Sequence, residues 1–382
     1  MTILSRPNST MKLPTIEKPT LLLDPSRVQM NIKRMAEKAR AQGIRFRPHF
    51  KTHQSEQIGE WFREQGVSAI TVSSVDMARY FADCGWQDIT IAFPVNWRQL
   101  EKYWSLAQSV RLGLLVESME SVDWLEKNLS VPVNLWIEVD EGSGRSGVHW
   151  DDTNTLLYLA ERIRLSSHHQ YQGLLTHAGR IYSSSTIGEI ENVYTQTVQR
   201  LNQARDFLLT NSVERCEVSI GDTPGCSLVF DLGKVDEIRP GNFVFYDAQQ
   251  LRLGSCQPED IGVVLACPVV AKYPARGEVV IYGGAIHLSK DTVIDQGKPV
   301  YGLVALPGEQ GWGAPVPGGY VARISQEHGV VHLPEPFLSQ VSLGDILLVI
   351  PAHSCLSVSA LGEYYTLDGE IIPAFQGWLA SR

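Results

Sequence analysis

Apolar runs that alternate with amphipathic segments are the feature of this sequence that most constrains its fold. Eight such runs occupy residues 44–49, 67–73, 88–94, 110–116, 133–139, 171–177, 216–221 and 237–246. Helical periodicity falls between them at 54–65, 75–84, 96–107, 118–128, 151–165 and 187–210. Nearly continuous apolar strands that alternate with helices predict a parallel sheet. Eight units of this kind predict an N-terminal (β/α)8 TIM-type barrel over residues 25–253, with a short or absent helix after the seventh strand.

The pattern changes near residue 254. From Cys267 onward, strand-like runs are separated by Gly and Pro turns, and no helical period is visible. This predicts a C-terminal antiparallel β domain over residues 254–382, joined to the barrel by a linker at 254–260. An N-terminal strand at about 13–24, with the run TLLLD, is expected to join this domain. Asp24 is the predicted N-cap of a helix that begins at Pro25 and runs to about Gly43.

Composition excludes several classes of protein. The 382 residues carry a net charge of −9, which argues against a nucleic-acid partner. No apolar run approaches the roughly 20 residues of a membrane span, and the N-terminus lacks the apolar core of a signal peptide. Six scattered cysteines without a CxxC pair indicate reduced thiols. We therefore expect a cytoplasmic protein that acts on a small molecule.

A lysine between two histidines marks the end of the first predicted barrel strand. The segment is RFRPHFKTHQ, with Lys51 between His49 and His53. Catalytic groups of such barrels lie at the C-terminal ends of the strands. A lysine whose amine is neutral often enough can attack a carbonyl and form a Schiff base. An ordinary surface lysine in a strand–helix loop explains the spacing about equally well.

Two further strand ends carry groups that suit a flat, anionic ligand. In VDEGSGRSGV (139–148), glycines allow close approach of the backbone, and Arg145 can bind a phenolate or carboxylate. In THAGRIY (176–182), His177 can contact a ring, and Tyr182 can hydrogen-bond to a ring nitrogen. The alternatives are an Arg145 paired with an acid such as Asp140, and a buried His177 bonded to a backbone carbonyl.

The segment GDTPGC (221–226) follows the seventh predicted strand. Thr223 offers a hydroxyl, and Gly221 and Gly225 leave their amides accessible. Loops after strands 7 and 8 of such barrels often bind phosphate, although the GxxxxGK pattern of a P-loop is missing. Taken alone, the segment is better explained as an ordinary turn that caps a short helix.

The segment IPAHSCLS (350–357) follows the strand-like run DILLVI. If the extended conformation persists, His353 and Cys355 lie on one face, because the strand period is two. Imidazole and thiolate then suit a zinc ion, with water or substrate as the remaining ligands. A core cysteine beside an exposed histidine is the alternative, and the pair alone favours it.

Together these segments resemble the D-threonine aldolase and D-serine dehydratase group of pyridoxal-phosphate enzymes, which share an alanine-racemase-type fold. The resemblance covers most of the chain and rests on TLLLDPSRVQMNI, RPHFKTH, VDEGSGRSGV, GLLTHAGRIY, GDTPG, EIRPGNFVFYD, PAHSC and YTLDG in that order. It implies a barrel plus a β domain, pyridoxal 5'-phosphate as cofactor, and a homodimer.

The resemblance also implies roles for individual residues. Lys51 resembles the Schiff-base lysine and general base, Arg145 the arginine at the phenolic oxygen, and Tyr182 the tyrosine at the pyridine nitrogen with His177 beside the ring. The phosphate ligands would be Gly221, Thr223 and Gly225. His353 and Cys355 resemble the metal pair of the dehydratase branch, with Zn2+ or another divalent ion. Arg180 departs from the family, whose members often carry a histidine there.

We therefore expect a metal-dependent lyase that dehydrates a D-configured β-hydroxy amino acid, D-serine or 3-hydroxy-D-aspartate, to a keto acid and ammonia. Retro-aldol cleavage of D-threonine-like substrates is the nearest alternative; Cys355 and Arg180 disfavour it. A pyridoxal-phosphate-binding protein without turnover and an amino-acid racemase are further alternatives. The racemase lacks a convincing second acid/base in this sequence.

Overall fold

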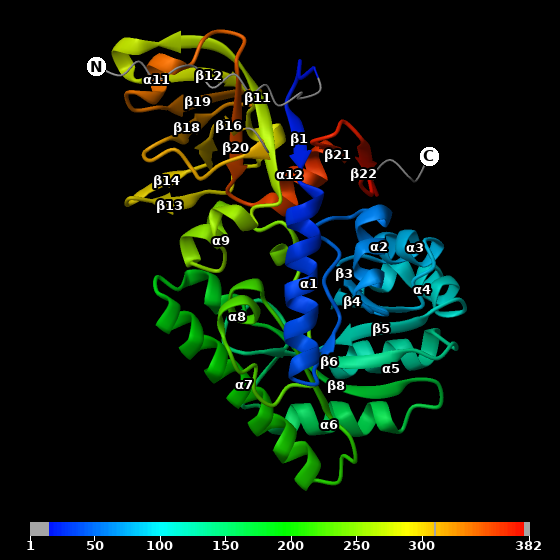
Figure 1. The fold of residues 1–382 in the computed structure, drawn as a ribbon. Coiled ribbons are helices and arrows are strands. Elements are labelled where there is room, and N and C mark those ends of the chain that lie inside the picture. Colours follow the sequence, from blue (N-terminus) through cyan, green and yellow to red (C-terminus); the bar gives the residue numbers. More distant parts are fainter. Residues whose placement is uncertain (1–14, 309–310, 378–382) are drawn as a thin grey trace. The chain divides into compact units, whose positions relative to one another are not determined.

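The computed structural model describes residues 15–308 and 311–377, which form two compact units. Of these described residues, the barrel unit comprises Ile32–Phe243, Leu253–Ser255 and residues 375–377. The β unit comprises Val244–Arg252 together with residues 15–31, 256–308 and 311–374. Each unit is described by itself below, with the element labels of Figure 1.

Eight parallel strands build the barrel unit, as the sequence predicts. They are β2 (Arg45–Phe46), β3 (Ala69–Val72), β4 (Asp88–Pro94), β5 (Arg111–Val116), β6 (Asn134–Asp140), β8 (Gln170–His177), β9 (Glu217–Gly221) and β10 (Glu237–Ile238). Their order is β3-β4-β5-β6-β8-β9-β10-β2, and the short β7 (Val148–His149) pairs with β6. A parallel bridge between His49 and Thr71 connects the chain after β2 with β3 and so joins the two ends of the sheet.

Helices connect these strands at the predicted places (Figure 1). They are α2 (Glu56–Glu64), α3 (Val75–Asp83), α4 (Leu100–Ala107), α5 (Met119–Asn128), α6 (Thr153–Arg164), α7 (Ile187–Thr210) and α8 (Thr223–Leu228). Ser74 and Ser118 accept the amides of Met77 and Ser121 and thereby cap α3 and α5. Side-chain caps of this kind explain why these helices begin directly after the polar strand ends.

The predicted start of the first helix is confirmed. Helix α1 spans Pro25–Ala41. The Asp24 carboxylate accepts the amides of Ser26 at 3.0 Å and Arg27 at 3.2 Å. A proline at the first helical position leaves no amide there to satisfy, so Asp24-Pro25 fixes this boundary.

The β unit is a nine-stranded sheet of order β12-β19-β18-β15-β20-β11-β1-β21-β22. Its strands are β1 (Thr20–Leu23), β11 (Val263–Tyr273), β12 (Glu278–Tyr282), β15 (Gly302–Ala305), β18 (Tyr320–Ile324), β19 (His328–His332), β20 (Ile346–Pro351), β21 (Glu363–Thr366) and β22 (Ile371–Pro373). Neighbours are antiparallel except β1 and β21. The run TLLLD belongs to this sheet, as expected.

The expectation that the C-terminal region lacks helices is wrong. Helix α9 (Ala248–Leu253) ends the predicted barrel range, and beyond it short helices occur at α10 (Ala285–Leu288), α11 (Phe337–Gln340) and α12 (Ser354–Leu361). The segment SCLSVSAL of α12 contains no charged residue and therefore shows no polar face. Of these three helices, α10 and α11 have only four residues each, too few for a period of 3.6 to be visible.

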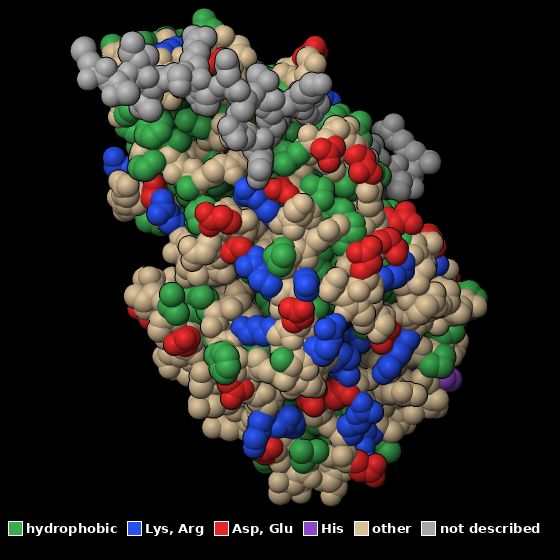
Figure 2. All heavy atoms as spheres, in the orientation of Figure 1, with side chains coloured by type: hydrophobic (Ala, Val, Ile, Leu, Met, Phe, Trp, Pro, Cys, Tyr) green, Lys and Arg blue, Asp and Glu red, His purple; other side chains and the backbone are tan. Residues whose placement is uncertain are grey.

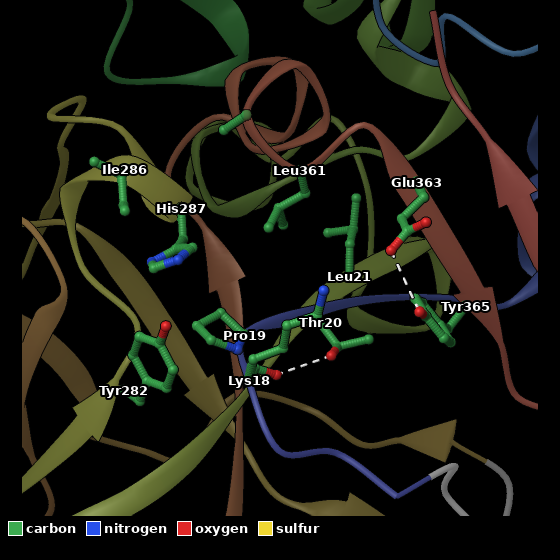
Figure 3. Close-up of a pocket in the computed structure, with 11 residues that line it drawn as sticks. Lys18, Pro19, Thr20, Leu21, Tyr282, Ile286, His287, Leu361, Glu363 and Tyr365 are labelled. Atoms are coloured by element: carbon green, nitrogen blue, oxygen red, sulfur yellow. Dashed lines mark hydrogen bonds between the residues drawn. The ribbon is translucent and has the colours of Figure 1, made fainter. Parts of the chain in front are cut away.

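A cavity of about 330 Å³ opens in the β unit at the C-terminal end of α12 (Figure 3). Leu21 and Leu361 line it together with Tyr282 and His287, and the hydroxyl of Tyr365 donates to Glu363 at 3.3 Å. None of the residues that the sequence singles out for chemistry lines this cavity.

Surface charge agrees with the composition. On the face shown in Figure 2, Lys and Arg side chains are interspersed with Asp and Glu. Each helix in the described part of the chain is too short or too polar to cross a bilayer.

Candidate active site

Lys51 lies in a turn after β2, at the C-terminal end of the barrel strands. The preceding Phe50 is fully buried and packs edge-on against Phe81 and Trp86, with ring centroids 4.9 and 5.0 Å apart. Phe50 therefore anchors the turn, while Lys51 itself is exposed. The backbone amide of Lys51 points at Nδ1 of His49, 3.4 Å away.

The two histidines that flank Lys51 have different surroundings. His53 is fully buried, and its ring packs against Phe50 and Phe62 with centroids 4.3 and 5.4 Å apart. Burial lowers the pKa of His53 to about 3, so its ring is neutral. His49 interacts with the charge of Lys51. Burial has the larger effect, and together the two hold the pKa of His49 well below its ordinary value.

The loop after β6 is held by Asp140. Its Oδ1 accepts the amides of Gly142 at 2.9 Å and Gly144 at 3.0 Å. Burial raises the pKa of this carboxyl, but the loop amides outweigh that effect and lower it. Gly147 has φ +101°, and a Cβ there would lie 2.8 Å from the carbonyl oxygen of Glu138. The sequence GSGRSG is thus needed for the course of the loop itself.

Arg145 projects from this loop and is 61% exposed. Its guanidinium does not pair with Asp140 but lies 3.6 Å from Oε1 of Glu138, which also accepts from Ser146 at 2.8 Å. The second oxygen of Glu138 is buried and has no hydrogen-bond partner within the described chain. Arg145 therefore stays available to an anionic ligand while Glu138 orients it.

His177 ends strand β8 and has a fixed orientation. Its Nδ1 lies 2.6 Å from the carbonyl oxygen of Gly221, so this nitrogen donates and Nε2 carries the lone pair. Burial, then the charges of Lys51 and Arg145, lower the pKa of His177 to about 3. The ring stacks on that of Tyr182 with centroids 5.8 Å apart. The sequence alternative for His177 thus gives the carbonyl contact correctly, although the side chain is half-buried.

The segment GDTPGC forms the end of β9 and the start of α8, which Asp222 caps. The amide of Thr223 donates to the hydroxyl of Tyr182 at 3.3 Å. A Cβ on Gly221 would lie 3.0 Å from the carbonyl oxygen of Arg239. The amide of Gly225 donates to Asp222, so this amide already has an acceptor. Gly221 and Gly225 are accordingly required for close packing.

These groups come together around His49 and His177. The charges of Lys51, Arg145 and Arg239 each act on both rings and favour their neutral forms, although burial has the larger effect. Arg239 is buried, and burial lowers its pKa to about 10, so it is a cation at neutral pH. Three cations beside two neutral imidazoles form a set that attracts an anion.

This donor set fits pyridoxal phosphate, the cofactor that the sequence resemblance implies. An exposed lysine amine suits its aldehyde, and the cations suit its phosphate and phenolate oxygens. The neutral ring of His177 stacks on Tyr182 and therefore offers a flat surface.

The predicted metal pair lies in the β unit, and its local structure differs from the expectation. Strand β20 ends at Pro351, His353 is the extended N-cap of α12, and Cys355 lies in the first helical turn. The expectation that both residues continue a strand is therefore wrong. The two side chains nevertheless lie close together in this turn, since a hydrogen bond joins His353 and Cys355.

Two carboxylates surround this pair. Oδ2 of Asp291 lies 3.0 Å from Nδ1 of His353, and Asp247 accepts the amide of Ser354 at 3.0 Å. Burial lowers the pKa of His353, but Cys355, Asp247 and Asp291 together raise it to about 10. Imidazole, thiol and carboxylate are donors that suit zinc. Within the described ranges, no group of three or more His, Cys, Asp or Glu is arranged to hold a metal ion.

Sequence reasoning did not single out Arg239, Glu138 and Asp291. Arg239 follows β10 directly in EIRPGN, so its place at a strand end was a usable signal. Glu138 lies inside an apolar strand run, where an acid is unusual and marks a buried partner. Asp291 lies 62 residues before His353, and no local pattern connects the two.

Comparison with protein families gives two matches. Residues 23–249 match the family described as alanine racemase, N-terminal domain. Residues 262–367 match a putative serine dehydratase domain.

Curated relatives resemble the chain over nearly its whole length. A D-serine dehydratase from Dictyostelium discoideum is 29% identical, over 94% of this chain and 95% of the relative. A D-threo-3-hydroxyaspartate dehydratase from Delftia sp. (strain HT23) is 28% identical, over 94% and 96%. A D-threonine aldolase from Arthrobacter sp. is 27% identical, over 89% and 86%.

Solved structures agree. That of the Delftia dehydratase superimposes with a TM-score of 0.86 at 28% identity and covers 97% of this chain and 100% of its own. A variant of that enzyme with a cysteine replaced by alanine, in the metal-free form, gives the same TM-score of 0.86 at 28% identity, with 97% and 100% covered.

Proposed function

The chain belongs to the alanine racemase N-terminal domain family, and from this premise we propose that it is a pyridoxal-phosphate- and metal-dependent lyase. Its substrate is a D-configured β-hydroxy amino acid, D-serine or 3-hydroxy-D-aspartate, which it converts to a keto acid and ammonia. The observation that carries this proposal is the convergence of Lys51, Arg145 and Arg239 around the neutral rings of His49 and His177.

The barrel residues would hold the cofactor. Lys51 would bind its aldehyde carbon covalently, Arg145 would bind its phenolic oxygen, and Tyr182 and His177 would contact its ring. Gly221, Thr223 and Gly225 are the candidate phosphate ligands. The buried hydroxyl of Thr223 is the strongest of these, because the Gly225 amide donates to Asp222.

Lys51 is also the general base. When bound, pyridoxal phosphate supplies a conjugated ring that accepts the electron pair left at Cα. The substrate amine would replace Lys51 at the aldehyde carbon, and the Nζ of Lys51 released in this way would accept the proton from Cα. His177 does not compete for this proton, because its pKa lies near 3. His177 and Arg145 keep the reacting groups oriented while Lys51 moves the proton.

His353 and Cys355 would supply two protein ligands to a zinc ion. Hydroxide is a poor leaving group, and a bound metal ion stabilises an oxygen that departs with its electron pair. The names of the dehydratases that the chain resembles, and the metal-free form of the Delftia variant, support this assignment. We also propose a homodimer, which sedimentation of the purified protein tests.

Retro-aldol cleavage, the reaction of D-threonine aldolase, needs a base at the β-hydroxyl. Arg180, the residue that departs from the family pattern, has a guanidinium group, which carries hydrogen-bond donors and no acceptor. Its guanidinium lies 3.9 Å from the buried carboxylate of Glu141, which stabilises the cation. Arg180 therefore cannot serve as this base, and dehydration is favoured.

The deciding experiment compares Lys51→Ala with Lys33→Ala, a lysine on α1 that is 54% exposed. Both proteins are assayed with pyridoxal phosphate, zinc and a panel of D-amino acids, for keto acid and ammonia and for glycine and aldehyde. Lys51→Ala should abolish turnover and the covalent attachment of the cofactor to the chain by borohydride, whereas Lys33→Ala should keep both.

Turnover by Lys51→Ala refutes the proposal. Labelling of the unmodified chain without turnover supports a non-catalytic binding protein, and interconversion of D and L isomers a racemase.

A further inference from the structure

Asp291 meets His353 although the two residues are far apart in sequence. Asp291 lies in the loop between α10 and the strand β13 (Val293–Asp295), and His353 immediately precedes α12. Oδ2 of Asp291 lies 3.0 Å from Nδ1 of His353. The two side chains are 52% and 34% exposed, so a metal ion from solution can reach this place.

We propose that Asp291 is a positioning residue for the metal ion: it accepts the Nδ1 proton of His353 and thereby assigns Nε2 as the ligand nitrogen. This inference rests on the proposed metal site. A neutral imidazole carries one proton, and the ring nitrogen that keeps it cannot bind a cation. A carboxylate at Nδ1 fixes the tautomer, orients the ring and makes Nε2 more basic.

Asp247 has a separate task at the same place. Its Oδ2 accepts the amide of Ser354 at 3.0 Å and lies 3.4 Å from the Ser354 hydroxyl. Asp247 and Ser354 are both buried. Asp247 therefore holds the first turn of α12, and with it the backbone that carries Cys355. Asp247 thus fixes the turn that carries Cys355, and Asp291 fixes the imidazole ring of His353.

Direct coordination by Asp291 is the competing role. The hydrogen bond to Nδ1 engages Oδ2, and the described residues contain no group of three or more donors arranged for a metal. A residue that acts through His353 should change the affinity of the site for zinc but leave the set of protein ligands unchanged.

The test measures zinc binding by the metal-free full-length chain, without any assay of activity. Asp291→Ala and Asp291→Asn are compared with the unmodified protein by competition with a chromogenic chelator. Asp368→Ala serves as the control, because it removes the same charge from an exposed turn of the same unit. We expect Asp291→Ala to weaken zinc binding about 10- to 100-fold, Asp291→Asn to lie between, and Asp368→Ala to bind as the unmodified chain does.

Cobalt substitution separates positioning from coordination. At saturating Co2+, Asp291→Ala should keep the thiolate charge-transfer band and the visible ligand-field bands of the unmodified protein. A changed ligand-field spectrum would identify Asp291 as a ligand and overturn the inference. Zinc binding by Asp291→Ala at the strength of the unmodified protein would overturn it as well.

His353→Ala and Cys355→Ala serve as references. If they lose zinc while Asp291→Ala retains it, only this inference fails; if the unmodified chain binds no zinc, the proposed metal site fails as well. Circular dichroism confirms that each variant is folded, and Asp291→Asn carries the test should Asp291→Ala not fold.

Discussion

Inside the barrel, Nε of Arg47 lies 2.7 Å from Oε2 of Glu237. Nε of Arg45 donates to the same oxygen at 2.5 Å. The Glu237 side chain is fully buried and that of Arg47 is 6% exposed. Burial alone would raise the pKa of Glu237, but the two guanidinium groups lower it to about 2. Glu237 is therefore ionised at neutral pH and neutralises charge inside the barrel.

Removing this carboxylate should be strongly destabilising. Glu237→Ala leaves the buried guanidinium of Arg47 with Asp88, 2.6 Å away, as its remaining carboxylate partner. Breaking a buried ion pair on one side costs about 3–5 kcal/mol of unfolding free energy. Urea unfolding followed by circular dichroism measures the loss. Glu60→Ala is the control, since Glu60 is 47% exposed and pairs with Arg63 on α2. It should cost no more than ~1 kcal/mol, and equal losses in both variants would contradict this account.

The stability of the barrel unit should depend on pH through Asp222. Burial raises the pKa of its carboxyl to about 7. The amides of Gly225 and Cys226 act to lower this pKa, and the charge of Glu141 acts to raise it. Because the folded pKa exceeds the unfolded value of 3.8, the stabilisation is complete below pH 3.8 and is lost as the pH rises through 7.

Asp222→Asn removes this dependence but keeps an oxygen that accepts the Gly225 amide. Relative to the unmodified protein, the variant should gain melting temperature as the pH rises from 4 to 8. Thermal melts of both cofactor-free proteins across this range provide the measurement. Two parallel curves would show that Asp222 is ionised throughout.

The alternation of apolar runs predicted the barrel because each strand is buried on both sides and each helix on one. The last strand shows the limit of that signal. The apolar run 237–246 predicts a long strand, but β10 ends at Ile238. Pro240 has no amide for a sheet ladder, and residues Asn242–Val244 form a 3₁₀ turn instead. Apolar composition reports burial, and the backbone chemistry of proline decides the conformation.

The candidate site was predictable where it depends on strand ends. Lys51, Arg145 and His177 all follow or end barrel strands, so topology alone gathers them. The proposed metal pair, His353 and Cys355, was singled out by its residue types, although its expected strand geometry is wrong, because SCLSVSAL has no charged face to reveal a helix. The contact of Asp291 with His353 was not predictable. It arises from the packing of two loops of the β unit, and the periodicity of a single sequence does not indicate which loops pack together.

Gly225 should tolerate no side chain. A Cβ at this position would lie 2.3 Å from Cδ2 of Tyr194 and 2.7 Å from Oδ1 of Asp222, and all three residues are buried. Gly225→Ala should therefore destabilise the protein by about 1–3 kcal/mol, as overpacking of a buried site does. Gly188→Ala is the matched control on α7, because nothing lies within 4 Å of its Cβ position. Because Gly188 lies in the first turn of α7, this substitution should change the unfolding free energy by no more than ~0.5 kcal/mol. Differential scanning calorimetry measures both, and a stable Gly225→Ala protein would contradict the packing argument.

Asp140 should control the affinity for the cofactor without contacting it. Its Oδ1 accepts the amides of Gly142 and Gly144 and so fixes the loop that presents Arg145. Hydrogen bonds to a charged acceptor contribute about 1.5–3 kcal/mol each, so Asp140→Ala should release the loop and raise the Kd for pyridoxal phosphate about tenfold or more. Asp151→Ala is the control, since Asp151 is 61% exposed and removes the same charge from the same unit. Absorbance titration of the cofactor-free proteins measures both constants. Equal constants for the two variants would show that the loop does not position Arg145 for the cofactor, whereas an unmodified chain that fails to bind would refute the proposed function itself.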